Sequence, residues 1–322
     1  MFRFYRLRGA IFGLNFFLLL FIMFVEAIER VNLFTRPVKF VTRFYGQKQH
    51  GLVPGAATLF FVNQDGWAVT CNHVAQQFLQ EADIRKQYLQ FAAERRRISN
   101  EPNFAGQLQR LEQQFGYTSG AIIGITSGFV GCFEQLENVH IVSHPLYDLA
   151  LLKLTGKIPQ YQQSAVFLAD GIPIKPGKSL CRLGYPFAEF SNFRLNPDLD
   201  NVEWTKEQDF LLQPFPIDGI VTRHLYDGQG KASALEISTP GLRGQSGGPL
   251  FDSAGLVYGM QFATRHLHLG FDLINQEVLL NNQPKHVSNH PFLHVGMCIS
   301  ADVIKAFMRE NNVPFYQAKP QV

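Results

Sequence analysis

The stretch TPGLRGQSGGPLFDSAGLVYGM, Thr239 to Met260, surrounds Ser246 with glycines and then becomes an apolar, strand-like run. Glycine serves where the backbone must take a positive φ or where another molecule approaches closely. Such a loop can be a capped turn. It can also hold a nucleophilic serine while backbone N–H groups face the oxygen that becomes negative during acyl transfer. Gly244 and Ser246 are spaced to supply two such donors, an oxyanion hole. A nucleophile loop predicts a base and an orienting acid elsewhere in the chain.

The segment GWAVTCNHVAQQF provides a candidate base, His73. The turn residues Asp65 and Gly66 precede a short apolar run from Trp67 to Cys71, which predicts a buried strand with His73 just past its end. A rigid strand end is the kind of framework that a positioned imidazole needs. The alternative is a structural histidine at a strand end.

The segment HPLYDLALLKL provides a candidate acid, Asp148. It stands at the start of the apolar run Leu149 to Leu154, whose sides we expect to be buried. A carboxylate that enters a core without a partner is costly, so a charged or hydrogen-bonding partner is expected there. The alternative is an aspartate that only starts a strand or caps a turn.

The three candidates follow the chain in the order His73, Asp148, Ser246. That order distinguishes the chymotrypsin type of catalytic triad from the subtilisin and α/β-hydrolase types. The segments VTCNHVA, YDLALLKL and GQSGGPL resemble the histidine, aspartate and serine segments of trypsin-like (chymotrypsin-fold) serine peptidases, closest to the high-temperature-requirement (HtrA) type. The resemblance extends over residues 50–312.

The resemblance implies an all-β fold of two six-stranded antiparallel β-barrels, with the active site in the cleft between them. The first barrel would cover residues 50–175 and the second residues 176–300, followed by a terminal helix at 301–311 and a tail at 313–322. HtrA-type proteins usually carry a PDZ domain after the peptidase, and only the short tail follows here.

The interval between His73 and Asp148 is long for this fold, and its first part has apolar residues at helical spacing on both sides of Pro102. This pattern predicts a helical hairpin, residues 76–116, inserted into the first barrel. A second insertion, from Leu267 to Phe292, reads as a loop because it is rich in Asn and Ser and contains Pro291.

Histidines are concentrated in and around the second insertion: His286, His290 and His294 recur at intervals of four, and His266 and His268 precede them. Such spacing would align metal ligands on a helix, but the composition favours a loop. We therefore expect no metal and no other cofactor, and a metal site at these histidines is the alternative.

The first 30 residues predict a membrane-targeting segment. Three arginines precede a stretch without charge from Gly9 to Val25, which as a helix would be about 26 Å long at ~1.5 Å per residue. We expect a single-pass transmembrane anchor with the peptidase on the non-cytoplasmic side, followed by a linker at 31–49. The alternative is a cleaved signal peptide and export.

Composition indicates a folded protein. With 322 residues, of which 46% are hydrophobic and 17% charged, the chain can bury two barrel-sized cores, and a net charge of +3 is too weak to predict a nucleic-acid partner. The four cysteines lie in apolar, strand-like contexts and are expected to be free thiols.

These observations predict a serine endopeptidase that acts on protein or peptide substrates through an acyl-enzyme, and oligomerisation is possible. The alternatives are a catalytically silent, peptidase-like scaffold at the membrane and an esterase with the same triad. The resemblance places the primary specificity pocket at Pro240 and Gly241 and along the strand Gln261 to Thr264. No carboxylate lies there, so we expect a small or medium apolar side chain before the scissile bond. Neutral Gln245, just before the nucleophile, predicts an enzyme that is competent without cleavage of a propeptide.

Overall fold

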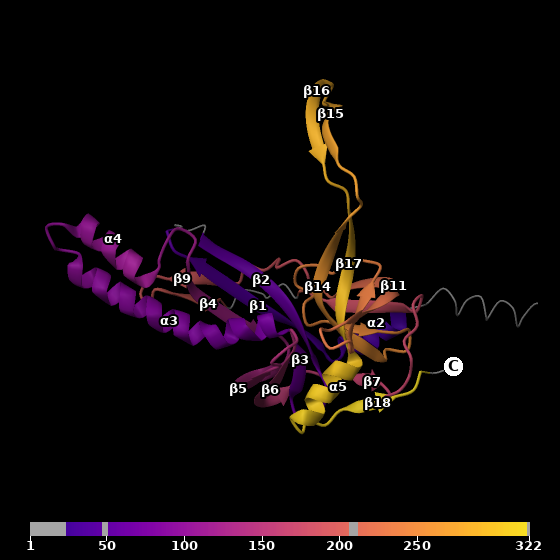
Figure 1. The fold of residues 1–322 in the computed structure, drawn as a ribbon. Coiled ribbons are helices and arrows are strands. Elements are labelled where there is room, and N and C mark those ends of the chain that lie inside the picture. Colours follow the sequence, from indigo (N-terminus) through magenta and orange to yellow (C-terminus); the bar gives the residue numbers. More distant parts are fainter. Residues whose placement is uncertain (1–23, 47–50, 206–211, 321–322) are drawn as a thin grey trace, which may run out of the picture.

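The computed structural model describes residues 24–46, 51–205 and 212–320, and it is a mostly β structure with two barrels (Figure 1). The expected membrane segment lies largely in residues 1–23, outside the described residues. Among the helices that the structure does describe, none combines the length and the apolar character needed to cross a membrane.

Six antiparallel strands form the first, nearly closed barrel, in the order β4-β1-β2-β3-β6-β5. Their bounds are β1 Thr35–Phe44, β2 Leu52–Phe61, β3 Trp67–Thr70, β4 Ile122–Phe129, β5 Phe133–Ser143 and β6 Ala150–Pro159. The apolar run after Asp148 is fully buried in β6, as its composition predicted, and it packs with the aromatic end of β2 in the main core.

The second barrel is a closed ring of six antiparallel strands in the order β13-β8-β11-β12-β17-β14, which the pairing of β13 with β14 completes. Their bounds are β8 Ser179–Gly184, β11 Phe215–Tyr226, β12 Ala232–Ile237, β13 Pro249–Phe251, β14 Val257–His268 and β17 Phe292–Ser300. Two short parallel strands, β7 Val166–Leu168 and β18 Tyr316–Ala318, extend the sheet beside β14. The predicted two-barrel fold is confirmed.

The inserted helical hairpin is α3 Asn72–Ile98 and α4 Phe104–Phe115, and it extends away from the barrels (Figure 1). Gly116 ends α4 in the left-handed conformation with φ 69°. An aromatic cluster that includes Tyr88, Phe91 and Tyr117 joins the hairpin to the first barrel. The hairpin also contacts the ribbon β9 Phe193–Asn196 and β10 Asn201–Trp204, because Tyr88 donates a hydrogen bond to Asp200 at 2.7 Å.

The segment in which we expected a linker, residues 31–49, contains β1, which pairs with both β2 and β4. Its positive charges resemble a solvated linker, but they have partners inside the fold. Arg36 donates to the carbonyl of Gly131 at 2.6 Å, and buried Lys39 lies 4.9 Å from the centre of the Phe190 ring. The preceding helix, α2 Val25–Asn32, also packs on the core through Ala27 and Val31. The folded body therefore begins before residue 31.

The segment expected to be a loop, Leu267 to Phe292, forms a protruding ribbon instead, and we call β15 Leu273–Leu280 and β16 Gln283–Asn289 the arm (Figure 1). Its turn is Asn281 and Asn282, both with positive φ, 52° and 58°. Asn tolerates this conformation, and two such residues match the twist of a tight hairpin. The asparagines that favoured a loop therefore make a β-turn. Every residue of the two arm strands is exposed.

The C-terminal helix α5 Ala301–Glu310 confirms the predicted terminal helix. Ser300 caps its N-terminus by accepting a hydrogen bond from the N–H of Val303. Fully buried Lys305 fixes it to the second barrel by binding the carbonyl of Leu168 and the carboxylate of Asp170, each at 2.6 Å.

Candidate active site

His73 and Asp148 lie next to each other because β3 and β6 are paired strands. Thr70, near the end of β3, pairs with Ala150 at the start of β6, so the residues just outside these strand ends meet. The backbone N–H of His73 donates to Oδ1 of Asp148 at 2.8 Å, and Nδ1 of the imidazole lies 2.6 Å from Oδ2. His73 stands in the first turn of α3, so strand and helix together orient its ring.

Asp148 is held in its ionised form. Partial burial acts to raise the pKa of its carboxyl group, but the hydrogen bonds from His73, with the backbone N–H of Asn72, outweigh burial and hold that pKa below its ordinary value. An ionised carboxylate accepts from Nδ1–H of the imidazole. This leaves Nε2, on the other side of the ring, free to act as a base.

The loop that carries Ser246 has a glycine with positive φ on each side of the serine, where a side chain would clash. Gly244 has φ 101°, and a Cβ there would lie 2.5 Å from the carbonyl oxygen of Tyr185. Gly247 has φ 88°, and its Cβ would lie 2.0 Å from the carbonyl oxygen of Thr58. The glycines that stood out in the sequence therefore allow the loop to turn against the first barrel.

Within the described part of the chain, the N–H groups of Gly244 and Ser246 have no hydrogen-bond acceptor. Two free donors beside a serine match the requirement for an oxyanion hole. The hydrogen bonds among the described residues do not include one between Ser246 and His73, although both residues border the same cavity.

Thr58 is a site residue that the sequence did not reveal. Its fully buried hydroxyl donates to the carbonyl of Gly244 at 2.8 Å and accepts from the N–H of Tyr185 at 3.1 Å, while its own N–H donates to the carbonyl of Ser246 at 2.9 Å. Thr58 thereby binds the serine loop of the second barrel to β2 of the first. A threonine in a β-strand carries no sequence signal for this role.

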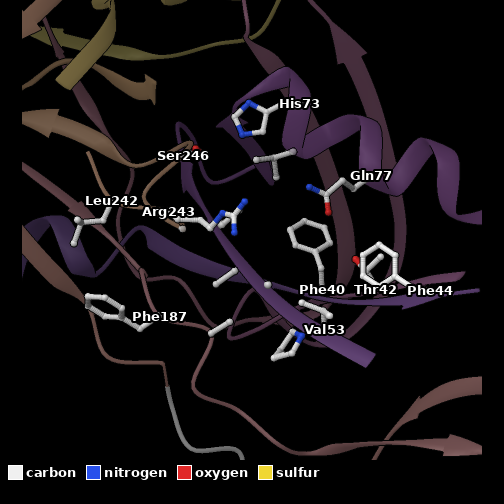
Figure 2. Close-up of a pocket in the computed structure, with 17 residues that line it drawn as sticks. Phe40, Thr42, Phe44, Val53, His73, Gln77, Phe187, Leu242, Arg243 and Ser246 are labelled. Atoms are coloured by element: carbon white, nitrogen blue, oxygen red, sulfur yellow. The ribbon is translucent and has the colours of Figure 1, made fainter. Parts of the chain in front are cut away.

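The cavity that His73 and Ser246 share has a volume of about 790 Å³, and Figure 2 shows both residues at its upper edge. The aromatic side chains of Phe40, Phe44 and Phe187 contribute to its walls, and Arg243 projects into it. The cleft therefore offers an apolar surface next to the two reactive groups.

A second cavity, of about 410 Å³, is also lined by Ser246. The four residues that we assigned to the specificity pocket, Pro240, Gly241, Gln261 and Thr264, all line it. The hydroxyl of Thr264 donates to the carbonyl of Gly241 at 2.8 Å, which fixes the loop to β14.

The histidines that we considered as metal ligands divide into three groups. His266 and His294 pair across β14 and β17, with their Nδ1 atoms 2.5 Å apart, and both line the second cavity. His268 and His290 flank Asp272 at 2.7 and 2.8 Å, close enough for the three side chains to share an ion. The same contacts are also ordinary hydrogen bonds between histidine and aspartate. His286 lies further out, on the arm, and contacts the carbonyl of Asn275.

The four cysteines are buried free thiols, as expected. Cys71 is the nearest to His73, and burial raises the pKa of its thiol well above the ordinary value. A thiol that remains protonated is a poor nucleophile. The nucleophilic candidate in the cleft is therefore Ser246.

The structure consists of two packed six-stranded barrels. His73 and Asp148 lie on the first barrel and Ser246 on the second, which is the arrangement of a two-barrel peptidase. The model of the trypsin-like peptidase domain matches residues 57–260. The chain belongs to this family.

Several solved structures resemble the fold. The HtrA-type protease AlgW with a decapeptide has 13% sequence identity and a TM-score of 0.45, with 88% of this chain and 66% of that chain covered. The active form of the Rv3671c protease from M. tuberculosis has 14% identity and a TM-score of 0.44, with 90% and 86% covered. A substituted form of AlgW with a tripeptide has 13% identity and a TM-score of 0.43, and the match covers 88% of this chain but only 62% of that chain. No curated protein matches the sequence.

Proposed function

We propose that this trypsin-like peptidase is a serine endopeptidase with Ser246 as nucleophile, His73 as general base and Asp148 as the group that orients the imidazole. The observation that supports this most is the double hydrogen bond between His73 and Asp148, at 2.8 and 2.6 Å, beside a cavity that Ser246 also lines.

In the proposed reaction, Nε2 of His73 takes the proton of Ser246 as Oγ attacks the scissile carbonyl. The N–H groups of Gly244 and Ser246 then donate to the oxyanion of the tetrahedral intermediate, and the imidazolium gives its proton to the leaving amine. Water attacks the resulting acyl-enzyme by the same route in reverse. The hydrogen bond from Ser246 to His73 would form as substrate enters, since such contacts often tighten only in the complex.

The substrates we propose are proteins or peptides. A peptide chain would lie across the cleft, with one side chain in the cavity of about 410 Å³ and the following residues against the apolar walls of the larger cavity. Two of the similar structures are of the HtrA-type protease AlgW with a tripeptide and a decapeptide, and we propose the HtrA type for this chain on the sequence segments given above. An oligomer is compatible with this proposal.

Labelling with a fluorophosphonate probe tests the mechanism. The wild-type protein should be labelled at Ser246, and Ser246→Ala should not be labelled. His73→Ala should react far more slowly, because loss of a triad member costs on the order of 10⁴ to 10⁶ in rate. Equal labelling of wild type and His73→Ala would refute the mechanism. No labelling at all would favour the alternative of a catalytically silent scaffold, and matched ester and peptide substrates would separate a peptidase from an esterase.

We also propose that the first residues of the chain anchor it in a membrane, on the strength of the uncharged run from Gly9 to Val25. Because α2 packs on the core, such an anchor would end close to residue 24. Alkaline carbonate extraction of membranes from expressing cells should leave the full chain in the pellet. A soluble mature protein that begins near residue 28 would instead support signal cleavage.

A further inference from the structure

Basic residues border the cavity beside Ser246. His266 and His294 line it, and Arg243 borders it as well, although the guanidinium of Arg243 projects into the larger cavity (Figure 2). The 2.5 Å between the Nδ1 atoms of the two histidines requires a shared proton, since two lone pairs would repel each other at this distance. None of the residues that the structure describes along this wall carries a carboxylate.

Gln261 forms the floor of this cavity. It is buried, and it lies so close to the loop that a Cβ on Gly241 would be 2.2 Å from its Nε2. Nε2 donates to the carbonyl of Ala263 at 2.6 Å, while Oε1 accepts from Nη1 of Arg182 at 2.8 Å. The amide is thus held in one orientation by a guanidinium directly behind the floor.

Arg182 is a fully buried cation that forms no ion pair with a carboxylate of the described residues. Its side chain is 0% exposed, and its other contacts are the carbonyl and hydroxyl of Thr239, at 3.0 and 2.6 Å. The negative charge of Asp218 acts on it from beyond ion-pair distance, and its buried Nε has no hydrogen-bond partner among the described residues. A charge that is only partly compensated in a low-dielectric interior is costly, so an anion placed in the cavity would be attracted to it.

We infer that this cavity binds the acidic side chain, glutamate or aspartate, of the residue that precedes the scissile bond. The inference rests on the proposed function, because it assigns a substrate class to the same site. The carboxylate would accept a charge-assisted hydrogen bond from an Nε2–H of the His266–His294 pair and would be stabilised by the charge of Arg182 behind Gln261. This acidic preference replaces the apolar preference that we expected from the sequence. The sequence alone could not show which side chains surround the pocket.

Four fluorogenic peptides that differ only in the residue before the scissile bond, Glu, Gln, Leu or Lys, test the inference. Gln has nearly the shape of Glu without its charge. The kcat/KM for Glu should exceed that for Gln by about tenfold or more, as expected for a charge-assisted contact of ~1.4 kcal/mol or more. The double variant His266→Ala/His294→Ala should bring this ratio close to one. His286→Ala, a histidine on the arm outside the cavity, is the matched control and should keep the wild-type ratio.

Fluorophosphonate labelling of the same preparations separates this inference from the proposed function. If Ser246 is labelled and the Gln or Leu peptide is cleaved as well as the Glu peptide, the acidic preference is wrong and the serine peptidase stands. If Ser246 is not labelled, the proposed function fails, and the pocket is tested by binding. Peptides that end in Glu should then bind Ser246→Ala more tightly than peptides that end in Gln, and equal affinities would overturn the inference.

Discussion

The side chain of Gln245 accepts a hydrogen bond from the backbone N–H of Leu242, 3.0 Å away across the turn that presents Ser246. Its Nε2 donates to the carbonyl of Phe215 at 3.0 Å, and the whole side chain is buried. A neutral amide therefore holds the serine loop, with its donor and its acceptor both satisfied. The loop has no buried charge at this position that a newly released N-terminal ammonium would neutralise.

We therefore predict that activity does not depend on release of a defined N-terminus. A chain that begins near residue 24, so that α2 and β1 stay intact, and that carries an N-terminal tag should react with a fluorophosphonate at the rate of the untagged chain. Mass spectrometry of the labelled protein should find the tag still attached. Labelling that begins only after proteolytic clipping would contradict this prediction.

Asp148→Asn should lower kcat by about 10⁴, because an amide can hold the imidazole in the wrong tautomer. Overall structure should change little, and circular dichroism of the variant serves as the check. Since the pKa of Asp148 lies below its ordinary value, the wild-type rate should not fall from protonation of this carboxyl until the pH drops below ~4. If the wild-type rate instead falls near pH 5 and the rate of Asp148→Asn does not, the pKa of Asp148 is raised and this prediction is wrong.

Thr58→Val should slow labelling of Ser246 more than it disturbs the fold. The isosteric change removes the hydrogen bonds to Gly244 and Tyr185 and leaves two buried partners unsatisfied, at a cost of about 1–3 kcal/mol. Thr35→Val is the matched control, because Thr35 is also fully buried and donates to the carbonyl of Val31, outside the serine loop. We expect urea unfolding to show a similar loss of stability in the two variants, and we expect slower labelling of Ser246 only in Thr58→Val. Equal labelling of the two variants would remove Thr58 from the site.

Asp170→Asn should lower the free energy of unfolding by about 1 kcal/mol. This is less than the loss expected for a fully buried ion pair, because Asp170 is half exposed and because Lys305 keeps its contacts to Asp302 and Leu168. The hydrogen bond from Lys305, together with Arg309, lowers the pKa of Asp170 in the folded protein. A carboxyl group whose pKa is lower in the folded protein than in the unfolded chain stabilises the fold at every pH above its unfolded pKa of ~3.9. This stabilisation is lost as the pH falls through the pKa of the folded state. The difference in urea unfolding free energy between wild type and Asp170→Asn should hence be constant from pH 5 to 8 and shrink below pH ~4. A difference that grows on acidification would refute this assignment.

The two-barrel fold could be predicted because the segments that carry the resemblance to trypsin-like peptidases are local. The apolar runs after Asp65–Gly66 and after Asp148 specify β3 and β6, and their pairing brings His73 to Asp148. Contacts between distant segments could not be predicted in this way. Thr58 reaches Gly244 across 186 positions of the chain, and the pairing of His266 with His294 depends on the register of β14 and β17. Residues 35–44 carry charges whose partners only the folded structure supplies, which is why β1 resembled a linker.

The arm and the wall of the smaller cavity belong to one continuous two-stranded ribbon. β14 and β17 carry His266 and His294 where they border the cavity, and they continue outward into β15 and β16 (Figure 1). Both strands of the arm are exposed along their whole length. A partner that bound the arm and moved it would act on the spacing of His266 and His294 without entering the cleft.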